Sequence, residues 1–353
     1  MKHRFILSYK RKLSLSTLEI FHQGLIGLGA KPVHYGHLYR ALFGVVPWPV
    51  EDDLKFPKEL RKELPAIKAK LDSILTVVES HQAQEEQSLK LLFRLQDGQT
   101  IESVLLPREG LCVSSQVGCA VGCVFCMTGQ SGLIRQLSDL EIVAQVMVAR
   151  RMRPDLRKVV FMGMGEPSHN LKNVLSAIQF LGTYSQIPHK NLVLSTVGDQ
   201  RVFDALKDAS VKPALAISLH TTFEDKRKKL LPRAGKITIE SLVNQAEDYA
   251  RATGYPIQYQ WTLMKGVNDG EDELENIARL LQGKYALMNF IPVNAVENSP
   301  FQRPDWSRCQ EMARTLKTSR ILAKFRHSAA QDVEGGCGQL RSRYLKGEEL
   351  RHE

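Results

Sequence analysis

The amino-acid sequence has no apolar segment near the roughly 18 residues needed to cross a bilayer, which argues against an integral membrane protein. It also has no repeat of fixed period and no low-complexity tract. With 43% hydrophobic and 24% charged residues, the 353 residues form neither a disordered nor a fibrous chain. No long apolar stretch follows the basic first twelve residues, so we expect no secretion signal and predict a cytoplasmic protein.

Acidic residues are in deficit, because 38 Asp and Glu stand against 48 Lys and Arg and give a net charge of +10. This balance favours a polyanionic partner, although charge alone identifies none. Cysteine is scarce as well, with six in the chain, but Cys119, Cys123 and Cys126 lie close together. In a chain without a secretion signal, such crowding indicates metal or redox chemistry rather than structural disulfides.

The sequence lacks a G-x-G-x-x-G segment opening a helix after its first strand, which argues against a dinucleotide-binding fold. From residue 111 onward, short apolar strands alternate with amphipathic helices, and this order predicts a parallel α/β sheet with right-handed crossovers. About six such units favour a full or partial barrel of the (β/α)6 type over a doubly wound sheet. The predicted strands are residues 111–115, 158–164, 191–196, 213–219, 257–263, 287–293 and 321–326.

Two further regions precede this α/β part. The first 75 or so residues carry apolar residues at helical spacing, which predicts a small helical accessory domain. Residues 89–95 and 100–106 flank an Asp97-Gly98 turn and predict a linking β-hairpin. We therefore predict an N-terminal domain at residues 1–87, a core domain at 88–345 and a C-terminal tail at 346–353.

The three clustered cysteines have the spacing C-x3-C-x2-C in a loop just after the first predicted strand. Nearby glycines let the backbone turn so that the three thiolates can converge. A structural zinc site normally takes four ligands, so zinc would need a distant cysteine such as Cys112 or Cys337. Three thiolates instead suit a [4Fe–4S] cluster with one iron left open for another ligand.

Polar and glycine residues recur where the predicted strands end. Functional groups of α/β barrels gather in the loops at the carboxyl ends of the strands. Each of these residues taken alone is as readily a helix cap or a turn residue, but together they predict a ring around one cofactor. The residues are Gly165 and Glu166 after the second strand, Ser195 after the third, Ser218, Leu219 and His220 after the fourth, and Asn294 after the sixth.

The cysteine spacing and its place after the first strand resemble the radical S-adenosylmethionine superfamily. Four further segments resemble its RlmN/Cfr methyltransferases, which act on adenosine in large-subunit ribosomal RNA and in some cases in transfer RNA. The resemblance implies one [4Fe–4S] cluster per chain, held by Cys119, Cys123 and Cys126, with S-adenosylmethionine bound at the open iron and by the residues at the strand ends. The four segments are residues 111–116, 161–167, 218–220 and 336–340.

The same resemblance gives three residues the roles of reacting groups. It implies that Cys337 takes a methyl group from a first S-adenosylmethionine, and that a deoxyadenosyl radical from a second removes a hydrogen so that this carbon adds to adenine. Glu102 is implied as the acceptor of the ring proton. Cys112 is implied as the thiol that attacks the sulfur of Cys337 and leaves a transient disulfide. Read without the family, Cys112 is expected to be a buried strand cysteine and Glu102 a solvent-facing carboxylate.

Two segments depart from the family's pattern, namely residues 326–336 before Cys337 and Pro232-Arg233-Ala234, and we expect such loops to face the RNA. Basic residues at 150–153 and 226–229, with Arg11, Lys12 and Arg40, are candidate phosphate contacts, although solvated helix faces are an equal alternative. We expect a monomer that takes electrons from a flavodoxin-type donor.

Both carbon 2 and carbon 8 of adenine remain candidates for the methylated atom, and both ribosomal and transfer RNA remain candidates for the substrate. Two other functions remain as alternatives: a radical enzyme of the same fold with another substrate, and a zinc-stabilised RNA-binding protein without catalysis.

Overall fold

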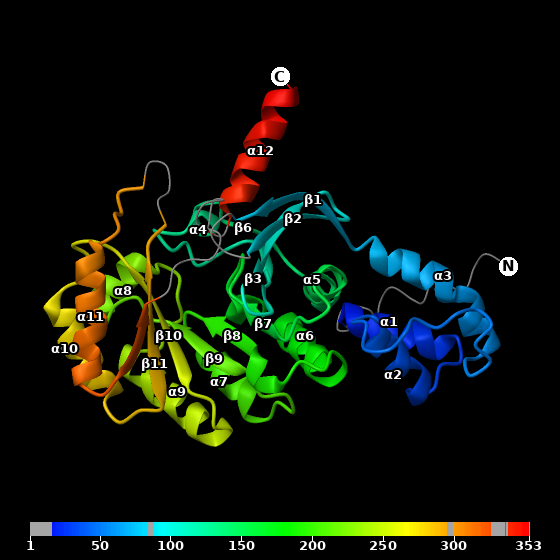
Figure 1. Ribbon diagram of the computed structural model, residues 1–353, viewed down its shortest axis with the longest axis horizontal. Helices are drawn as coiled ribbons and strands as arrows, with labels where there is room; N and C mark the ends of the chain where they lie inside the picture. The colour runs from blue at the N-terminus through cyan, green and yellow to red at the C-terminus, as the bar shows by residue number, and fades with distance from the viewer. Residues whose placement is uncertain (1–15, 84–87, 295–298, 326–335, 337, 353) are drawn as a thin grey trace.

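The computed structural model describes residues 16–83, 88–294, 299–325, 336 and 338–352 (Figure 1). These residues form one long mixed sheet with strand order β1-β2-β3-β4-β7-β8-β9-β10-β11-β12 and a separate β5–β6 hairpin. The strands are β1 (Leu75–Gln82), β2 (Leu89–Leu95), β3 (Thr100–Leu106), β4 (Gly110–Cys112), β5 (Gln116–Gly118), β6 (Leu133–Gln136), β7 (Lys158–Phe161), β8 (Leu192–Thr196), β9 (Ala214–Ser218), β10 (Ile257–Leu263), β11 (Ala286–Pro292) and β12 (Leu322–Phe325).

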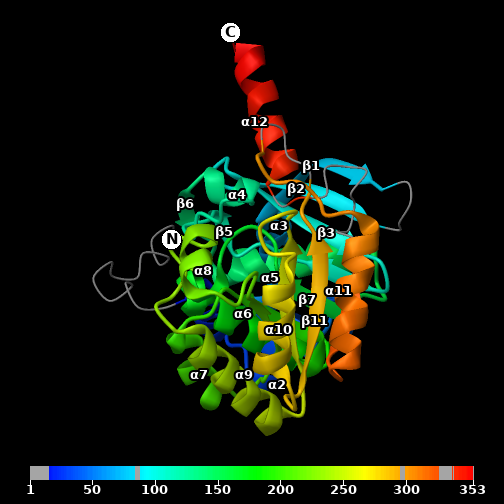
Figure 2. The same cartoon turned by 90° about the vertical axis from the view of Figure 1, so that its left-hand side faces the viewer.

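The strands from β4 to β12 in this order run parallel, and helices in the connections cover the outside of the curved sheet (Figure 2). Every strand predicted after residue 111 is present, so the α/β class with its partial barrel is confirmed. The helices that cover this part are α5 (Asp139–Met152), α6 (Leu171–Tyr184), α7 (Gln200–Lys207), α8 (Glu224–Leu230), α9 (Ile239–Thr253), α10 (Glu271–Leu281) and α11 (Trp306–Thr318).

Alternate residues of β4, β7, β8 and β9 enter two different cores, because side chains of a strand point to opposite faces. Leu111, Val159 and Ile217 belong to the large core beneath the helices. Their neighbours Cys112 and Ala216 belong to a smaller cluster on the inner face of the barrel, with Val160, Val193 and Ala214. The inner face is therefore lined by small side chains, which leaves the polar groups of the strand ends next to one another.

The predicted β2–β3 hairpin is also present, and it joins the parallel sheet through β4. Strand β1, which pairs with β2, was not predicted. Its sequence does not alternate cleanly between apolar and polar residues, and a bulge between Val77 and Glu79 shifts the register. A strand in which the alternation of apolar and polar residues is interrupted is not recognised by its two-residue period.

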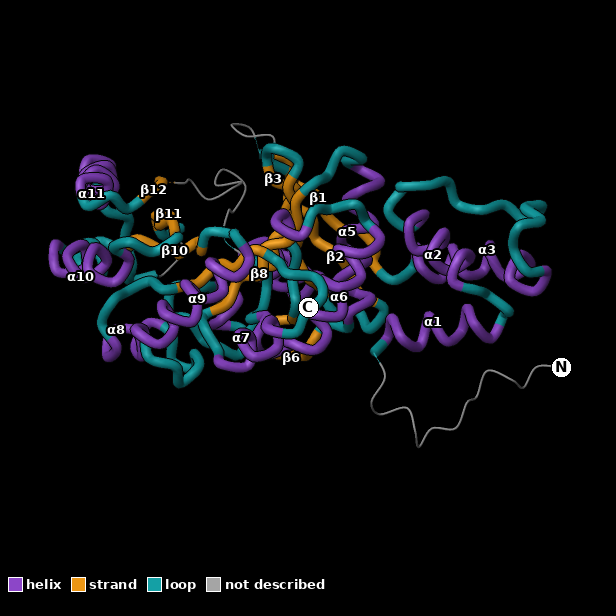
Figure 3. Tube along the Cα trace, turned by 90° about the horizontal axis from the view of Figure 1, so that it is seen from below, coloured by secondary structure: helices purple, strands orange, loops and turns teal. Residues whose placement is uncertain are grey.

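Three helices precede the sheet, as the sequence predicts, and lie at one end of the molecule (Figure 3). Ser16 caps the first of them by accepting a hydrogen bond from Glu19 N at 3.1 Å. The backbone N–H of Leu18 donates to Asp139 Oδ1 of α5 at 3.1 Å, and Tyr39 stacks edge-on against Phe180 of α6. The helices are α1 (Thr17–Gly27), α2 (Pro32–Ala41) and α3 (Lys58–Asp72).

These contacts join the N-terminal helices to the barrel through one continuous apolar core. The division at residue 88 stays a prediction. A last helix, α12 (Gln339–His352), projects from the hairpin edge of the sheet (Figure 1). Among the described residues, no helix is both long and apolar enough to span a bilayer.

Candidate active site

The cysteine loop lies between the β5–β6 hairpin strands and is folded tightly on itself. Cys119 follows β5, and Cys126 is the residue before the short helix α4 (Met127–Gln130). A Cβ atom on Gly118 would lie 1.9 Å from the carbonyl oxygen of Gly132, and one on Gly129 would lie 2.9 Å from Cys123 N. Side chains at either glycine would push the loop apart, so glycine is required where the chain must bring the three thiols together.

Burial makes the thiols of Cys119 and Cys123 poor anions by themselves. It raises the pKa of Cys119 to about 12 and also raises the pKa of Cys123, and the neighbouring thiols add to both shifts. A bound metal reverses this, because coordinated thiols are held deprotonated. The sulfurs of Cys119 and Cys123 are thus donors that a strongly cationic centre would ionise.

The part of the chain with a described structure has no group of three His, Cys, Asp or Glu side chains that could hold one metal ion. A single zinc ion needs its thiolates at about 2.3 Å from one centre. A cubane cluster instead takes each thiolate on a different iron, so its ligands lie farther apart. Three cysteines suffice for a cluster with one open iron, whereas a structural zinc site would need a fourth ligand.

An apolar shell surrounds the cysteine loop. Cys119 packs in a small buried cluster with Val121, Val197, Leu230, Leu231, Met264 and Val293. The ring of Phe125 lies edge-on to His220 at 4.9 Å between centroids. This shell keeps water from Cys119, and exclusion of water is one of the factors that set the potential of an iron–sulfur centre.

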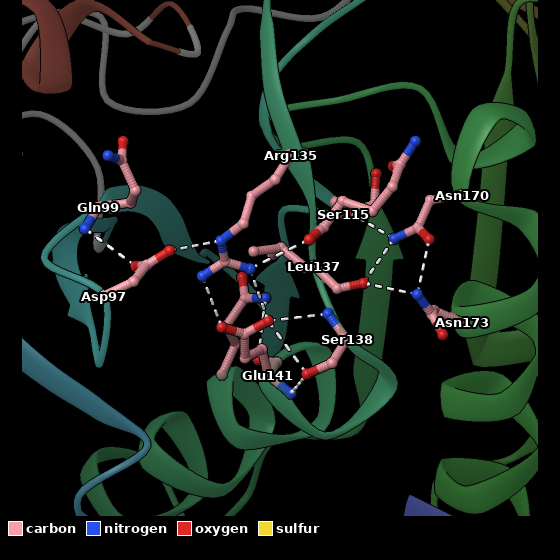
Figure 4. A network of polar contacts seen from close by, with 11 residues as sticks. Asp97, Gln99, Ser115, Arg135, Leu137, Ser138, Glu141, Asn170 and Asn173 are labelled. Carbon is pink, nitrogen blue, oxygen red and sulfur yellow. Dashed lines mark hydrogen bonds and ion pairs between the residues drawn. The ribbon is translucent and has the colours of Figure 1, made fainter. Parts of the chain in front are cut away.

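A polar network fixes the base of the loop (Figure 4). On β6, the guanidinium of Arg135 pairs with Asp97 of the β2–β3 turn at 2.6 Å and with Glu141 of α5 at 2.8 Å. Asn170 donates to the carbonyl oxygens of Ser115 at 2.8 Å and Leu137 at 2.7 Å. The network ties both ends of the cysteine loop to the hairpin and to two helices, which holds the thiols in place.

Glu166 is the centre of the strand-end residues. Its Oε1 accepts from Thr196 Oγ1 at 2.6 Å and from Ser168 N at 3.0 Å, and its Oε2 accepts from Val197 N at 3.0 Å. The carboxylate therefore links the ends of β7 and β8. Gly165 beside it has φ of +100°, and a Cβ there would lie 2.6 Å from the side chain of Gln116. Glycine is required for this close approach.

The remaining predicted strand-end residues lie on the same edge of the sheet. His220 has φ of +63°, and its Nδ1 accepts from Thr262 N at 2.9 Å. Burial, with the nearby charge of Arg227, lowers the pKa of His220 to about 3, so the imidazole is neutral. Ser195 and Ser218 lie at the ends of β8 and β9.

Two of the predicted residues do not offer a free side chain to a cofactor. Leu219 is fully buried in the main core, so it can offer only its backbone. Asn294 follows β11, and its Oδ1 accepts from Arg303 Nη2 at 3.4 Å.

A second group of predicted residues lies at the hairpin side. Register places Cys112 opposite Val104, two residues along β3 from Glu102, so both side chains share the inner face. Burial raises the pKa of Cys112 to about 12, and the charge of Glu102 adds to this shift. Glu102 is only 3% exposed, which corrects the solvent-facing position expected from the sequence alone. Cys337 lies outside the described residues, but both of its neighbours are described.

Comparison with known proteins gives the family. Residues 113–281 match the model of the radical SAM superfamily. A protein of Methylibium petroleiphilum named probable RNA methyltransferase is 57% identical over 94% of both chains. One of the same name in Thiobacillus denitrificans is 59% identical over 90% of this chain and 88% of its own. The crystal structure of a radical SAM methyltransferase from Sphaerobacter thermophilus superposes with a TM-score of 0.80 at 33% identity, covering 92% of this chain and 97% of that chain.

The chain belongs to the radical SAM methyltransferases. Membership implies a [4Fe–4S] cluster and S-adenosylmethionine, and the three-cysteine donor set, the apolar packing around Cys119 and the polar strand ends fit both groups.

The methyltransferase has buried polar residues near this edge that the sequence did not single out. Arg227 was placed in a basic surface segment, but it is 4% exposed and donates to the carbonyl oxygens of Val197 and Ser218. Burial lowers the pKa of Arg227. Asn289 of β11 is fully buried, and neither of its amide atoms has a hydrogen-bond partner among the described residues. No local pattern marks either residue, because both lie in ordinary helix or strand sequence.

Three other residues of the segments predicted to contact RNA also have structural partners in the methyltransferase. Arg151 pairs with Asp72 at 2.5 Å, and Lys226 pairs with the buried Glu273 at 2.8 Å. Arg233, in a segment expected to face RNA, donates from its guanidinium to Ala120 O of the cysteine loop at 3.2 Å. Lys228 and Lys229 are exposed, whereas Arg11 and Lys12 lie outside the described residues.

Proposed function

We propose that this methyltransferase acts on RNA and transfers a methyl group to carbon 2 or carbon 8 of an adenine, in ribosomal or transfer RNA, as the RlmN/Cfr enzymes do. Its relatives' names and the four sequence segments support the substrate class. The observation that carries the proposal is the hairpin side of the site, where Cys112 and Glu102 share the inner face and Glu102 contacts Gly338, the residue after Cys337. Such an arrangement suits a reaction that needs two thiols and a carboxylate.

The proposal gives the cysteine loop and the strand ends the task of holding the cofactors. Cys119, Cys123 and Cys126 hold one [4Fe–4S] cluster, and S-adenosylmethionine lies along Gly165, Glu166, Ser195, Ser218, Leu219, His220 and Asn294. When bound, these groups supply a methyl group to a thiol and a carbon radical that removes hydrogen. A flavodoxin-type protein is proposed as the electron donor, and the working form is proposed to be a monomer.

The chain's own residues then have separate roles. The ring carbons of adenine are electron-poor, so a thiolate is the better acceptor for the incoming methyl group, and Cys337 takes it. After the carbon has bonded to adenine, Glu102 removes the ring proton, and the unpaired electron of the adduct would return to the cluster that Cys119, Cys123 and Cys126 hold. Cys112 attacks the sulfur of Cys337, the carbon–sulfur bond breaks with its electron pair going to the carbon, and a proton from solvent completes the methyl group. The two cysteines are left as a disulfide, which a cellular thiol reductant must reduce before the next cycle.

Burial of Cys112 has a consequence for this order of events. A thiol with a pKa near 12 is protonated at neutral pH and a weak nucleophile. Cys112 is therefore protected from premature oxidation until a base takes its proton.

The test is anaerobic reconstitution with iron and sulfide, followed by reaction with S-adenosylmethionine carrying a fully deuterated methyl group. Ribosomal RNA and transfer RNA from cells lacking the modification are offered separately, and nucleosides are analysed by mass spectrometry. The expected product is adenosine methylated on a ring carbon, with one deuterium of the methyl group replaced by hydrogen. Methylation on nitrogen or oxygen, or retention of all three deuteriums, would refute the mechanism.

A Cys337→Ala variant separates the proposal from the first alternative, because a radical enzyme that uses no methylated cysteine keeps its product. Metal analysis separates the second, because a zinc-stabilised binding protein contains zinc, lacks iron and does not cleave S-adenosylmethionine.

A further inference from the structure

A buried ion pair lies beneath the start of α12. Lys90 of β2 and Glu102 of β3 are diagonal neighbours on one face of the hairpin, with Nζ and Oε2 3.2 Å apart. Their exposed fractions are 1% and 3%. Two charges taken out of water lose their hydration, and their mutual attraction offsets that loss only when further hydrogen bonds satisfy both groups. The other hydrogen-bond partners of Lys90 and Glu102 therefore indicate the role of the ion pair.

Those partners are backbone groups on both sides of position 337. Glu102 Oε2 accepts from Gly338 N at 2.8 Å, and Oε1 accepts from Arg341 N at 2.7 Å. Lys90 Nζ donates to Gly336 O at 2.9 Å. The carboxylate thus holds the first turn of α12, where unpaired N–H groups favour an anion, and the ammonium holds the residue before the cysteine.

The residue after the cysteine is also fixed against the cysteine loop. Gly338 has φ of +88°, and a Cβ atom on it would lie 2.6 Å from Thr128 Oγ1 of α4. Helix α4 begins directly after Cys126. Because only glycine allows this approach, the backbone beside position 337 is held between the Lys90–Glu102 pair and the helix of a cluster ligand.

We propose that Lys90 is a positioning residue for the Cys337 thiol. Together with Glu102 it holds the backbone groups of Gly336, Gly338 and Arg341 on both sides of position 337, and through them it limits the movement of that thiol during the reaction. Besides its proposed role as a base, Glu102 therefore holds the start of α12, because its two oxygens accept hydrogen bonds from Gly338 N and Arg341 N. The inference rests on the proposed function only for what the positioned thiol does.

Other contacts keep α12 on the hairpin without Lys90. Arg341 Nε donates to Thr100 O at 2.9 Å, and Arg343 pairs with Glu79 at 3.5 Å. Arg94 donates to the hydroxyl of Tyr344. Removal of the Lys90 ammonium is therefore expected to loosen the residues next to position 337 while the helix stays docked.

The test compares Lys90→Met with Lys212→Met in the reconstituted full-length enzyme. Lys212 is the matched control, since its Nζ also donates to backbone carbonyls, those of Leu206 and Lys207, away from the site. One readout is hydrogen exchange of the Gly338 and Arg341 amides. The other is the number of 5′-deoxyadenosine molecules formed per methylated nucleoside, which a purely structural role would leave unchanged.

For Lys90→Met we expect both the exchange rates and this ratio to rise about tenfold, because a small misplacement of a reacting group is costly. Iron content and total deoxyadenosine formation are expected to match those of the control. If exchange rises and the ratio does not, Lys90 only anchors the helix and the positioning role is refuted. If neither changes, the whole inference is refuted.

The proposed function can fail separately. If the wild-type enzyme methylates no RNA but Lys90→Met still speeds exchange, the anchoring stands and the function is wrong. Should Lys90→Met fail to fold because Glu102 is left unpaired, Lys90→Met/Glu102→Gln removes both charges, and its exchange rates decide whether the pair holds these amides.

Discussion

The two sides of the active site are built in different ways. On the cofactor side, Glu166, Thr196 and Ser218 come from the ends of neighbouring parallel strands and lie together because the strands do. On the thiol side, Glu102 of an antiparallel hairpin meets Gly338 across 236 positions of sequence. The first side follows from regular sheet geometry. The second depends on the docking of Gly336 and the start of α12 onto the hairpin, so it is the side that a few substitutions can misalign without disturbing the fold.

The largest expected effect sharpens the comparison on the cofactor side. Replacement Cys123→Ser removes one of three cluster ligands, and we expect bound iron to fall and 5′-deoxyadenosine formation to drop at least about a hundredfold. Cys309→Ala is the control, because Cys309 is a buried packing cysteine of α11 and should leave both values unchanged. Full cleavage activity in Cys123→Ser would remove the cysteine loop from the mechanism.

The corresponding change on the thiol side is Cys112→Ala. It leaves cofactor cleavage intact but removes the thiol that frees the RNA, so we expect RNA to stay covalently bound and released product to fall about a hundredfold. A denaturing gel with labelled RNA detects the adduct. Repeated turnover in this variant would show that another group releases the RNA from Cys337, and the role proposed for Cys112 would be wrong.

A smaller effect tests the link between strand ends. Glu166→Gln places an amide where the carboxylate accepts from Thr196, Val197 and Ser168, so at least one N–H loses its acceptor. We expect the free energy of unfolding to fall by about 2 kcal/mol and S-adenosylmethionine to bind more weakly. Denaturant unfolding and calorimetric titration measure these, with the exposed Glu275→Gln as control. Unchanged stability would mean that the strand ends are held by other contacts.

The neutral His220 predicts a pH dependence. Its pKa is lowered from 6.5 to about 3 by burial, so the unfolded chain binds a proton that the folded protein excludes. Stability from this group is present above pH 6.5 and is lost as the pH falls towards 3, by up to about 1.4 kcal/mol per pH unit. In His220→Asn the free energy of unfolding should fall less steeply with decreasing pH than in the wild type. Parallel curves would contradict the burial of a neutral imidazole.

The smallest effect concerns RNA contacts outside both sides. Lys229 is exposed, so Lys229→Ala should lower the salt dependence of RNA binding by about one unit of slope. Lys226 is paired with buried Glu273, so Lys226→Ala should reduce stability and leave the slope unchanged. Filter binding at several salt concentrations measures the slope. Equal slopes in both variants would mean that the end of α8 does not face the RNA.

Much of the cofactor side could be predicted because its signals are local. Apolar strands, their order and the residues that end them are encoded within a few positions, and the parallel sheet then brings Gly165, Glu166, Ser218 and His220 to one edge. The spacing of Cys119, Cys123 and Cys126 is local in the same way. Strand β1 escaped prediction because its bulge breaks the two-residue period.

The thiol side could be predicted only by resemblance. Nothing near Glu102 in the sequence indicates burial, and the pairing with Lys90 follows from hairpin register rather than from any motif. Arg227 is another charged residue whose burial could not be predicted from the neighbouring sequence. It stands in a run of basic residues typical of a solvated helix face, yet the turn of α8 directs it inward among Val197 and Ser218.

The sequence by itself determined the parallel sheet, the thiol spacing and the polar strand ends, because each of these features depends on residues that are close together in the chain. Only the tertiary structure decided which charges are buried and what they hold. The backbone beside position 337 contacts Lys90 and Glu102 because the start of α12 docks on the hairpin edge. Docking removes water from the two charged side chains, so they form hydrogen bonds with backbone groups instead.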